Sequence, residues 1–147
     1  MVKVLVKKLD PSVKLPEYKT EGASGMDLIA FVEGTINIKP KTSALIPTGI
    51  SVAFSEDYGI QIRPRSGLAA KNNISVLNTP GTIDSDYRGE IKVIIFNHSN
   101  NDFIVNNGDR IAQMILAPIM KMELEEAKNL PQTIRGKGGF GSTGKWV

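Results

Sequence analysis

The chain has 147 residues, of which 41% are hydrophobic and 22% are charged, and its formal net charge is +3. This length suits one soluble domain with a single core, and no apolar run approaches the roughly 20 residues that would span a bilayer. Because the chain has no cysteine and a single histidine, His98, disulfides, thiolate nucleophiles and histidine-cluster metal sites are excluded.

Short segments of alternating apolar and polar residues follow one another along most of the chain. Such alternation predicts half-buried strands. Turn signals rich in glycine, proline and asparagine separate the segments, at residues 33–34, 40, 47–49, 80–81 and 106–109. The segments expected to be strands are residues 2–6, 35–38, 50–54, 60–62, 92–97, 103–105 and 111–119, with Met120, Met122 and Leu124 continuing the alternation.

Only residues 66–71 look helical, and no helical pattern is long enough for a βαβ crossover. The sequence therefore predicts an all-β sandwich or jelly roll with one short helix. We expect a single domain over residues 1–147, with a flexible C-terminal arm from about residue 128. We expect no secretory signal, because lysines at positions 3, 7 and 8 interrupt the apolar N-terminus, and we expect His98 to be a solvated loop residue.

Residues 77–91 place an amide, an aromatic ring and the carboxylates of Asp84 and Asp86 on one predicted hairpin. Pro80-Gly81 favours a reversal of the chain between two apolar runs. Binding and catalytic residues are commonly found on loops that a rigid scaffold positions. The side chains of Asn78, Asp84, Asp86 and Tyr87 therefore form the first candidate site.

The C-terminal residues 127–147 are basic and rich in glycine. Two G-x-G-x-x-G matches and a near match to a phosphate-binding loop occur there, but none lies between a strand and a helix, as those motifs require. With only Phe140 and Trp146 as stacking rings, the tail favours a small polyphosphate over nucleic acid, and a disordered solvated tail is the alternative. The basic residues are Lys128, Arg135, Lys137 and Lys145.

The predicted hairpin resembles the uracil-binding hairpin of the trimeric deoxyuridine triphosphatase (dUTPase) family. The matching residues are Asn78, Gly81, Ile83, Asp84, Tyr87 and Gly89. Four further segments resemble family motifs in the expected order, at residues 23–28, 63–69, 108–114 and 135–144. The resemblance spans nearly the whole chain, and it implies the jelly-roll fold and a homotrimer with shared active sites.

The resemblance implies that the predicted hairpin recognises deoxyuridine. The Asn78 amide, with nearby groups of Gly81, Thr82 and Ile83, would read the uracil edge, because an amide offers both a donor and an acceptor. A tight hairpin would leave no room for the methyl group of thymine. Tyr87 would pack under the sugar and exclude a 2′-hydroxyl.

Asp84 would hold the water that attacks the α-phosphorus. A carboxylate is a weak base at neutral pH, so its value would come largely from orienting that water in line with the phosphorus. Without the family match, Asp84 would be a β-turn aspartate, and that is what we expect Asp86 to be.

The remaining motifs imply a site for the triphosphate and its Mg²⁺, which the substrate would carry with no direct protein ligand. Asp27 would contact the hydrated metal; without the family match it would be interpreted as a turn carboxylate. Gln113 would point to the phosphates or the attacking water. Asp109 and Arg110 are expected to be turn and ion-pair residues outside the site. Phosphate contacts would come from Arg65, Ser66 and Gly67, which alone read as a capped helix, and the closing arm would supply Arg135, Phe140, Gly141, Ser142 and Thr143.

The resemblance thus implies hydrolysis of dUTP to dUMP and pyrophosphate, which keeps uracil out of DNA and supplies dUMP for thymidylate synthesis. We expect a cytoplasmic enzyme (nuclear or organellar in a eukaryote) with no nucleic-acid or membrane partner. One alternative is a dCTP deaminase of the same fold, which needs a glutamate on the strand after the hairpin, where only Glu90 comes near. The other is a non-enzymatic nucleotide-binding jelly roll, which would be expected to lose Asp84, Ser66 or Phe140, and all three are present.

Overall fold

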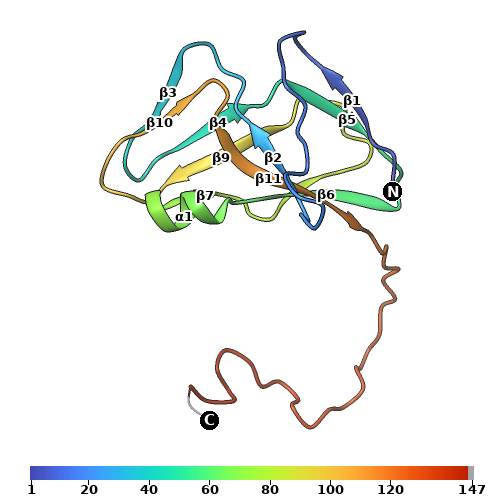
Figure 1. Ribbon diagram of the computed structural model, residues 1–147. Helices are drawn as coiled ribbons and strands as arrows, with labels where there is room; N and C mark the ends of the chain where they lie inside the picture. Colours follow the sequence, from blue (N-terminus) through green and yellow to red (C-terminus); the bar gives the residue numbers. More distant parts are fainter. Residues whose placement is uncertain (146–147) are drawn as a thin grey trace.

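The computed structural model describes residues 1–145, which form eleven strands and one helix (Figure 1). Every strand pair is antiparallel. The helix, α1 (Ser66–Asn72), is too short to cross a membrane. The strands are β1 (Leu5–Lys8), β2 (Met26–Ile29), β3 (Thr35–Ile38), β4 (Ser43–Pro47), β5 (Ile50–Ala53), β6 (Tyr58–Arg63), β7 (Ile74–Val76), β8 (Gly81–Ile83), β9 (Lys92–Asn97), β10 (Phe103–Asn106) and β11 (Arg110–Pro118).

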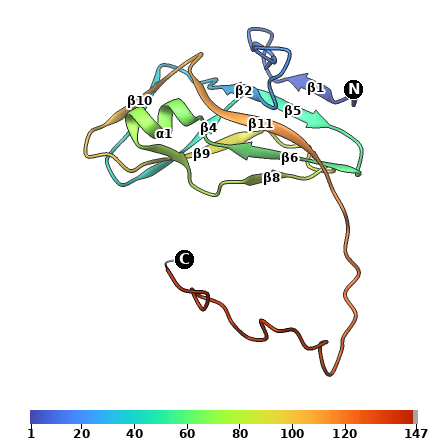
Figure 2. The same ribbon diagram turned by 60° about the horizontal axis from the view of Figure 1, so that its bottom comes forward.

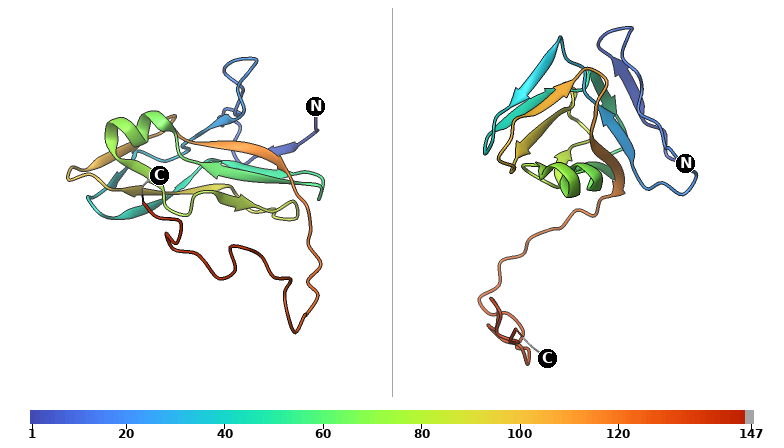
Figure 3. Two further views of the ribbon diagram at one scale, coloured as in Figure 1. Left: turned by 90° about the horizontal axis from the view of Figure 1, so that it is seen from below. Right: turned by 60° about the vertical axis from the view of Figure 1, so that its left-hand side comes forward.

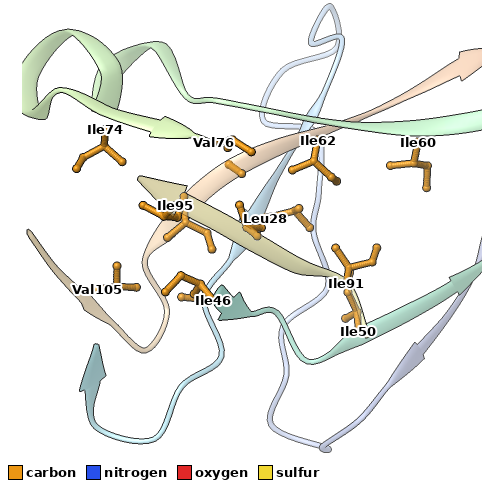
Figure 4. Close-up of a cluster of buried hydrophobic side chains, with 14 of the residues drawn as sticks. Leu28, Ile46, Ile50, Ile60, Ile62, Ile74, Val76, Ile91, Ile95 and Val105 are labelled. Atoms are coloured by element: carbon orange, nitrogen blue, oxygen red, sulfur yellow. The ribbon is translucent and has the colours of Figure 1, made fainter. Parts of the chain in front are cut away.

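Two main sheets enclose the core. One has the strand order β2-β11-β6-β8 and the other has the order β4-β9-β7, while β1-β5 and β10-β3 form two-stranded ribbons beside them. Apolar side chains from both main sheets point toward one another (Figure 4). The fully buried side chains include Leu28 on β2, Ile46 on β4 and Ile95 on β9. The prediction of an all-β sandwich with one short helix is confirmed.

Strand alternation sets which side chains face outward. On β6, Ile60 and Ile62 are buried, so Gln61 and Arg63 lie on the outer face of the sheet. On β2, Leu28 is buried and Asp27 faces outward by the same rule. The outer face of this sheet therefore carries polar side chains in neighbouring strands.

Two expectations about strands need correction. The alternation after residue 119 does not form a strand, because β11 ends at Pro118 and no strand runs beside the chain beyond it, which leaves Met120, Met122 and Leu124 at 94%, 82% and 86% exposed. The first strand lies at Leu5–Lys8, C-terminal to the predicted 2–6. His98 is an exposed loop residue, as expected; its Nε2 lies 2.7 Å from Ser75 Oγ, and its ring lies 4.5 Å from that of Phe96.

Residues 77–91 do not form a simple hairpin. β8 pairs with β6 in the four-stranded sheet, whereas β9 pairs with β4 and β7 in the three-stranded sheet. The segment therefore crosses from one sheet to the other, and its turns lie where the two sheets meet. The sequence pattern could not show this, since alternation identifies strands but not their partners.

A buried amide ties the end of β9 to its neighbours. The Asn97 side chain is fully buried and donates to the carbonyls of Ile38 at 2.9 Å and Asn101 at 2.7 Å, while it accepts from the backbone N–H and hydroxyl of Ser99. Replacing one partner in such a network leaves buried acceptors without donors.

We expect Asn97→Ala to lower the free energy of unfolding by about 3 kcal/mol, because it removes the donors of two carbonyls and leaves a void. Urea denaturation followed by circular dichroism would measure the change. The exposed neighbour Asn101→Ala, whose backbone carbonyl stays in place, serves as the control. A loss below about 1 kcal/mol would show that the network is not a stabilising one.

Candidate active site

A cavity of about 290 Å³ lies beside β8, where the chain crosses between the two sheets. This β8 cavity is lined from three directions: the turn before β8, the turn after it and the outer face of β4 and β9. Figure 2 shows β8 at the edge of its sheet, with the following loop turning back toward β9. The lining residues are Leu45, Asn78, Thr82, Ile83, Asp84, Tyr87, Glu90, Lys92 and Ile94.

Gly81 lets the Asn78 amide sit close to the start of β8. The peptide bond between Thr79 and Pro80 is cis, and Gly81 is buried beneath the turn. A Cβ on Gly81 would lie 3.3 Å from the Asn78 amide nitrogen and 3.3 Å from Ile62 Cβ, tighter than ordinary contact. The absence of a side chain at Gly81 therefore positions Asn78 at the cavity.

The Tyr87 ring lies over the backbone of Gly89 and is half exposed. Its hydroxyl donates to the carbonyl of Glu90 at 2.9 Å, and a Cβ on Gly89 would lie only 2.3 Å from that hydroxyl oxygen. The backbone N–H of Tyr87 donates to the carbonyl of Asp84 at 3.1 Å, which closes the turn. The ring is thus fixed at both ends, with one face available to a ligand.

Asp84 is exposed at the mouth of the β8 cavity. Across residues 1–145, no donor is hydrogen-bonded to its carboxylate and no cation lies within ion-pair distance of it. Its oxygens are free to accept a proton or to orient a water molecule.

Asp27 lies at the centre of a cluster with two arginines. Its Oδ1 accepts from Arg65 Nε at 3.0 Å and its Oδ2 accepts from Arg110 Nη1 at 3.0 Å, with the Asp27 side chain only 11% exposed. Arg65 also donates to the carbonyl of Arg110 at 3.2 Å. This Asp27 cluster, formed by Asp27, Arg65 and Arg110, borders a cavity of about 510 Å³.

Gln113 lies next to Asp27 across the sheet, and α1 begins close by. Gln113 on β11 is the register partner of Asp27 on β2 and of Arg63 on β6. Ser66 and Gly67 open α1 and are exposed, and the first backbone N–H bonded within the helix is that of Ala69, to the carbonyl of Arg65 at 3.0 Å. The N–H groups of the preceding turn therefore face outward.

The β8 cavity and the Asp27 cluster lie apart within one chain. Ile83 is in register with Ile60, so Asp84, the next residue, lies on the Gly59 side of that pair. Gly59 is four residues from Arg63 along β6. At about 3.3 Å per residue, this spacing separates Asp84 from the Arg63 end of β6 by about 13 Å, and Arg65 and Ser66 lie farther still. Figure 2 shows α1 and the loop after β8 at opposite ends of the body.

The residues predicted to close the site lie on an arm that leaves the body. This arm, residues 119–145, is held at its start by Ile119 N, which donates to the carbonyl of Asp57 at 2.8 Å, and by a 2.9 Å ion pair between Lys121 and Glu56. The hydrogen bond to Glu56 raises the pKa of Lys121. The right-hand view of Figure 3 shows the arm extending away from the sheets.

The far part of the arm is a series of tight turns. Arg135 Nε donates to the carbonyl of Gly138 at 2.9 Å, and Ser142 N donates to that of Gly139 at 3.0 Å. The Phe140 side chain is fully exposed. None of Arg135, Phe140, Gly141, Ser142 and Thr143 lines the β8 cavity of the same chain, and Trp146 lies outside the described residues.

No three carboxylate or histidine side chains of residues 1–145 lie close enough together to hold a metal ion. Both oxygens of Asp27 are already paired with guanidinium groups. A hard cation such as Mg²⁺ needs about six oxygen ligands, and no cluster of side chains in residues 1–145 offers that many.

Comparison with known proteins decides what this arrangement belongs to. The dUTPase family model matches residues 11–144. The chain belongs to the dUTPase family. A deoxyuridine 5′-triphosphate nucleotidohydrolase of Hydrogenobaculum sp. (strain Y04AAS1) is 54% identical over 143 residues, which cover 97% of this chain and 99% of the relative. The protein of the same name from Rickettsia conorii is 55% identical over 145 residues, 98% of each chain.

Solved dUTPase structures share the fold. The dUTPase of Staphylococcus bacteriophage 80alpha with dUpNHpp has a TM-score of 0.86 at 26% identity, over 97% of this chain and 98% of that one. The dUTPase of phage phi11 of S. aureus, whose structure concerns a structural Mg(II) ion, has a TM-score of 0.79 at 22% identity over 88% and 99%. These matches confirm the predicted family and the jelly-roll fold.

Sequence reasoning about the candidate site left out several residues that line or border the β8 cavity. Leu45, Lys92 and Ile94 line the β8 cavity, and the backbone carbonyl of Glu90 accepts a hydrogen bond from the Tyr87 hydroxyl. Alternation in the predicted strand 92–97 could have identified Lys92 and Ile94 as outward-facing residues. The neighbouring strand β4, which supplies Leu45 to the same wall of the cavity, could not be identified without the fold. Asp109, whose carboxylate accepts from Asn106 N at 2.8 Å, and Arg110 lie as expected in a turn and an ion pair.

Proposed function

We propose that this chain hydrolyses dUTP to dUMP and pyrophosphate. The observation that carries the proposal is the β8 cavity, where an amide, an aromatic ring and an unpaired carboxylate converge in a member of the dUTPase family. The two relatives above are named for this reaction.

In this proposal the β8 cavity binds deoxyuridine. The Asn78 amide, with Gly81, Thr82 and Ile83 beside it, reads the uracil edge, since one amide supplies a donor and an acceptor. The Tyr87 ring lies against the sugar. Because its hydroxyl is hydrogen-bonded to the carbonyl of Glu90, the ring does not move aside to admit a 2′-hydroxyl. Exclusion by a fixed group gives specificity without a direct contact to the preferred substrate.

Asp84 orients the attacking water in this proposal. Its carboxylate accepts a hydrogen bond from the water, holds it in line with the α-phosphorus and takes up its proton as the new bond to phosphorus forms. The bond between the α-phosphorus and the bridging oxygen then breaks, and pyrophosphate leaves.

The phosphate chain would be held by cationic and amide groups. Arg65, Ser66, Gly67 and Gln113 supply donors at one end of the four-stranded sheet. Mg²⁺ bound to the substrate's own phosphates would neutralise the developing charge, and Asp27 would be the residue that contacts its water shell. Because Asp27 pairs with Arg65 and Arg110, it also fixes the position of Arg65, the arginine proposed to contact the phosphates.

A homotrimer with shared sites would bring these parts together. Within one chain the β8 cavity, the start of α1 and the arm lie apart, so a complete site needs more than one copy. The exposed alternating side chains of Met120, Met122 and Leu124 have the pattern of a strand without a partner, which another subunit would supply. Arg135, Phe140, Gly141, Ser142 and Thr143 would then close over a neighbour's nucleotide.

Mixed trimers test this assembly. Co-expression of the Asp84→Asn chain with a chain lacking residues 134–147 should recover about a quarter of wild-type activity. Each mixed cyclic trimer then contains one complete site of three, and three quarters of the trimers are mixed. Background activity in trimers verified by two affinity tags would show that each arm serves its own chain.

The Tyr87 and Gly89 contact predicts a change in sugar selectivity. Gly89→Ala should push the ring away, because the new Cβ would lie 2.3 Å from the Tyr87 hydroxyl oxygen. We expect the UTP/dUTP ratio of kcat/KM to rise about tenfold, and further for Tyr87→Ala.

Gly22→Ala is the matched control for this change, since its Cβ would have no neighbour within 4 Å. Steady-state kinetics with both nucleotides measure the ratio for all three variants. An unchanged ratio in Tyr87→Ala would leave Tyr87 as a packing residue only.

A nucleotide panel tests the reaction itself. Pyrophosphate release from dUTP, with little from dCTP, dTTP or UTP, is the expected result. Ammonia release from dCTP would indicate the deaminase alternative, and binding without release of either product would indicate a non-enzymatic nucleotide-binding protein.

A further inference from the structure

Arg63 completes a polar row across the outer face of the four-stranded sheet. Asp27, Gln113 and Arg63 are register partners on β2, β11 and β6. Side chains of directly opposed residues lie on the same face of a sheet. With strands about 4.8 Å apart, the Cα of Arg63 lies about 5 Å from that of Gln113 and about 10 Å from that of Asp27.

The Arg63 guanidinium is oriented by its own strand. Gln61, two residues earlier on the same face, accepts from both Arg63 Nε, at 3.1 Å, and Arg63 Nη2. This contact engages one edge of the planar group and leaves its other N–H groups available. Among residues 1–145, no carboxylate lies within ion-pair distance of Arg63.

The charge balance of the row favours an anion. Asp27 contributes one negative charge, whereas Arg63, Arg65 and Arg110 contribute one positive charge each, which leaves a net charge of +2. Two of the three arginines already share Asp27. Arg63 is therefore the one whose charge the protein leaves uncompensated.

We propose that Arg63 is a further substrate-binding residue that grips the pyrophosphate portion of the triphosphate, beside Gln113. This inference rests on the proposed function and extends it by one residue. An arginine pairs with two phosphate oxygens through its planar fork, and a lysine cannot reproduce that geometry. Arg63 acts in binding and does not touch the water that attacks the α-phosphorus.

Inorganic tripolyphosphate tests the binding without any hydrolysis of dUTP. Calorimetric titration of the full chain with tripolyphosphate and, separately, with dUMP should show that Arg63→Gln weakens tripolyphosphate binding about tenfold and leaves dUMP binding unchanged. Arg63→Lys should retain only part of the affinity. Lys39→Gln, at the end of β3, removes the same charge elsewhere and should change neither titration. Thermal melting verifies that each variant folds.

Kinetics separate this inference from the proposed function. Arg63→Gln should raise KM for dUTP several-fold, leave kcat within about twofold of wild type and weaken inhibition by pyrophosphate to the same degree as it raises KM. Unchanged tripolyphosphate affinity, or equal losses in Arg63→Gln and Lys39→Gln, would overturn the inference. If wild type binds tripolyphosphate through Arg63 but does not hydrolyse dUTP, the proposed reaction fails and the anion-binding role of Arg63 stands.

Discussion

Replacing Asp84 with asparagine is expected to lower kcat for dUTP at least about a hundredfold, the scale usual for loss of a general base. The carboxylate is exposed at the β8 cavity and is bonded to no donor among residues 1–145, so its oxygens are free to hold a water. Asparagine keeps the size but removes the charge that accepts the proton. Affinity for dUTP should stay nearly unchanged, because the proposed function assigns the binding of base, sugar and phosphates to other groups.

Single-turnover kinetics and equilibrium titration with dUTP would separate these two effects. Asp86→Asn is the matched control, since it removes an exposed carboxylate from the same turn. More than a third of wild-type turnover in Asp84→Asn would remove Asp84 from the catalytic role.

Deleting residues 134–147 is expected to abolish most turnover and to leave the melting temperature without ligand within about 2 °C of wild type. The hydrogen bonds of residues 133–144 are local to the arm, so the sheets lose no support. The activity would fall because the deleted stretch contains Arg135 and Phe140, which are proposed to close over the phosphates and the base.

Phe140→Ala and Lys137→Gln divide the effect of the deletion. The first removes the exposed ring and should lower kcat/KM strongly, whereas the second removes a nearby charge and should change it little. Full activity in the truncated chain would contradict the arm's role, and a large drop in melting temperature would show that the arm supports the fold.

Much of the fold followed from local pattern. The alternating segments 35–38, 92–97 and 103–105 became β3, β9 and β10 with their ends within one residue. The short strands β2, β4, β7 and β8 were not predicted, because three to five residues show too little alternation to stand out. The alternation of Met120, Met122 and Leu124 misled for a different reason: a strand needs a neighbour, and the single chain provides none there.

The candidate site divides in the same way. Residues close in sequence, such as Asn78, Gly81 and Tyr87, were grouped from the sequence alone, and their geometry depends on turns that the sequence encodes locally. The pairing of Asp27 with Arg65 and Arg110 spans distant segments, so only the register of three strands could bring them together. Arg63 had no motif role, and its importance became visible only from its place in that register.

Because residues 77–91 cross between the two main sheets, the shape of the β8 cavity depends on how the two sheets pack on each other. Its first turn rests on β6 through Gly81 and Ile62, and its far end joins β9 on the other sheet. A small slide of one sheet over the other would therefore change the distance between Asn78 and Tyr87. If the β8 cavity binds the base as proposed, base selectivity depends on core packing, and a core substitution far from the cavity would change the UTP, dCTP or dTTP selectivity measured for dUTP hydrolysis.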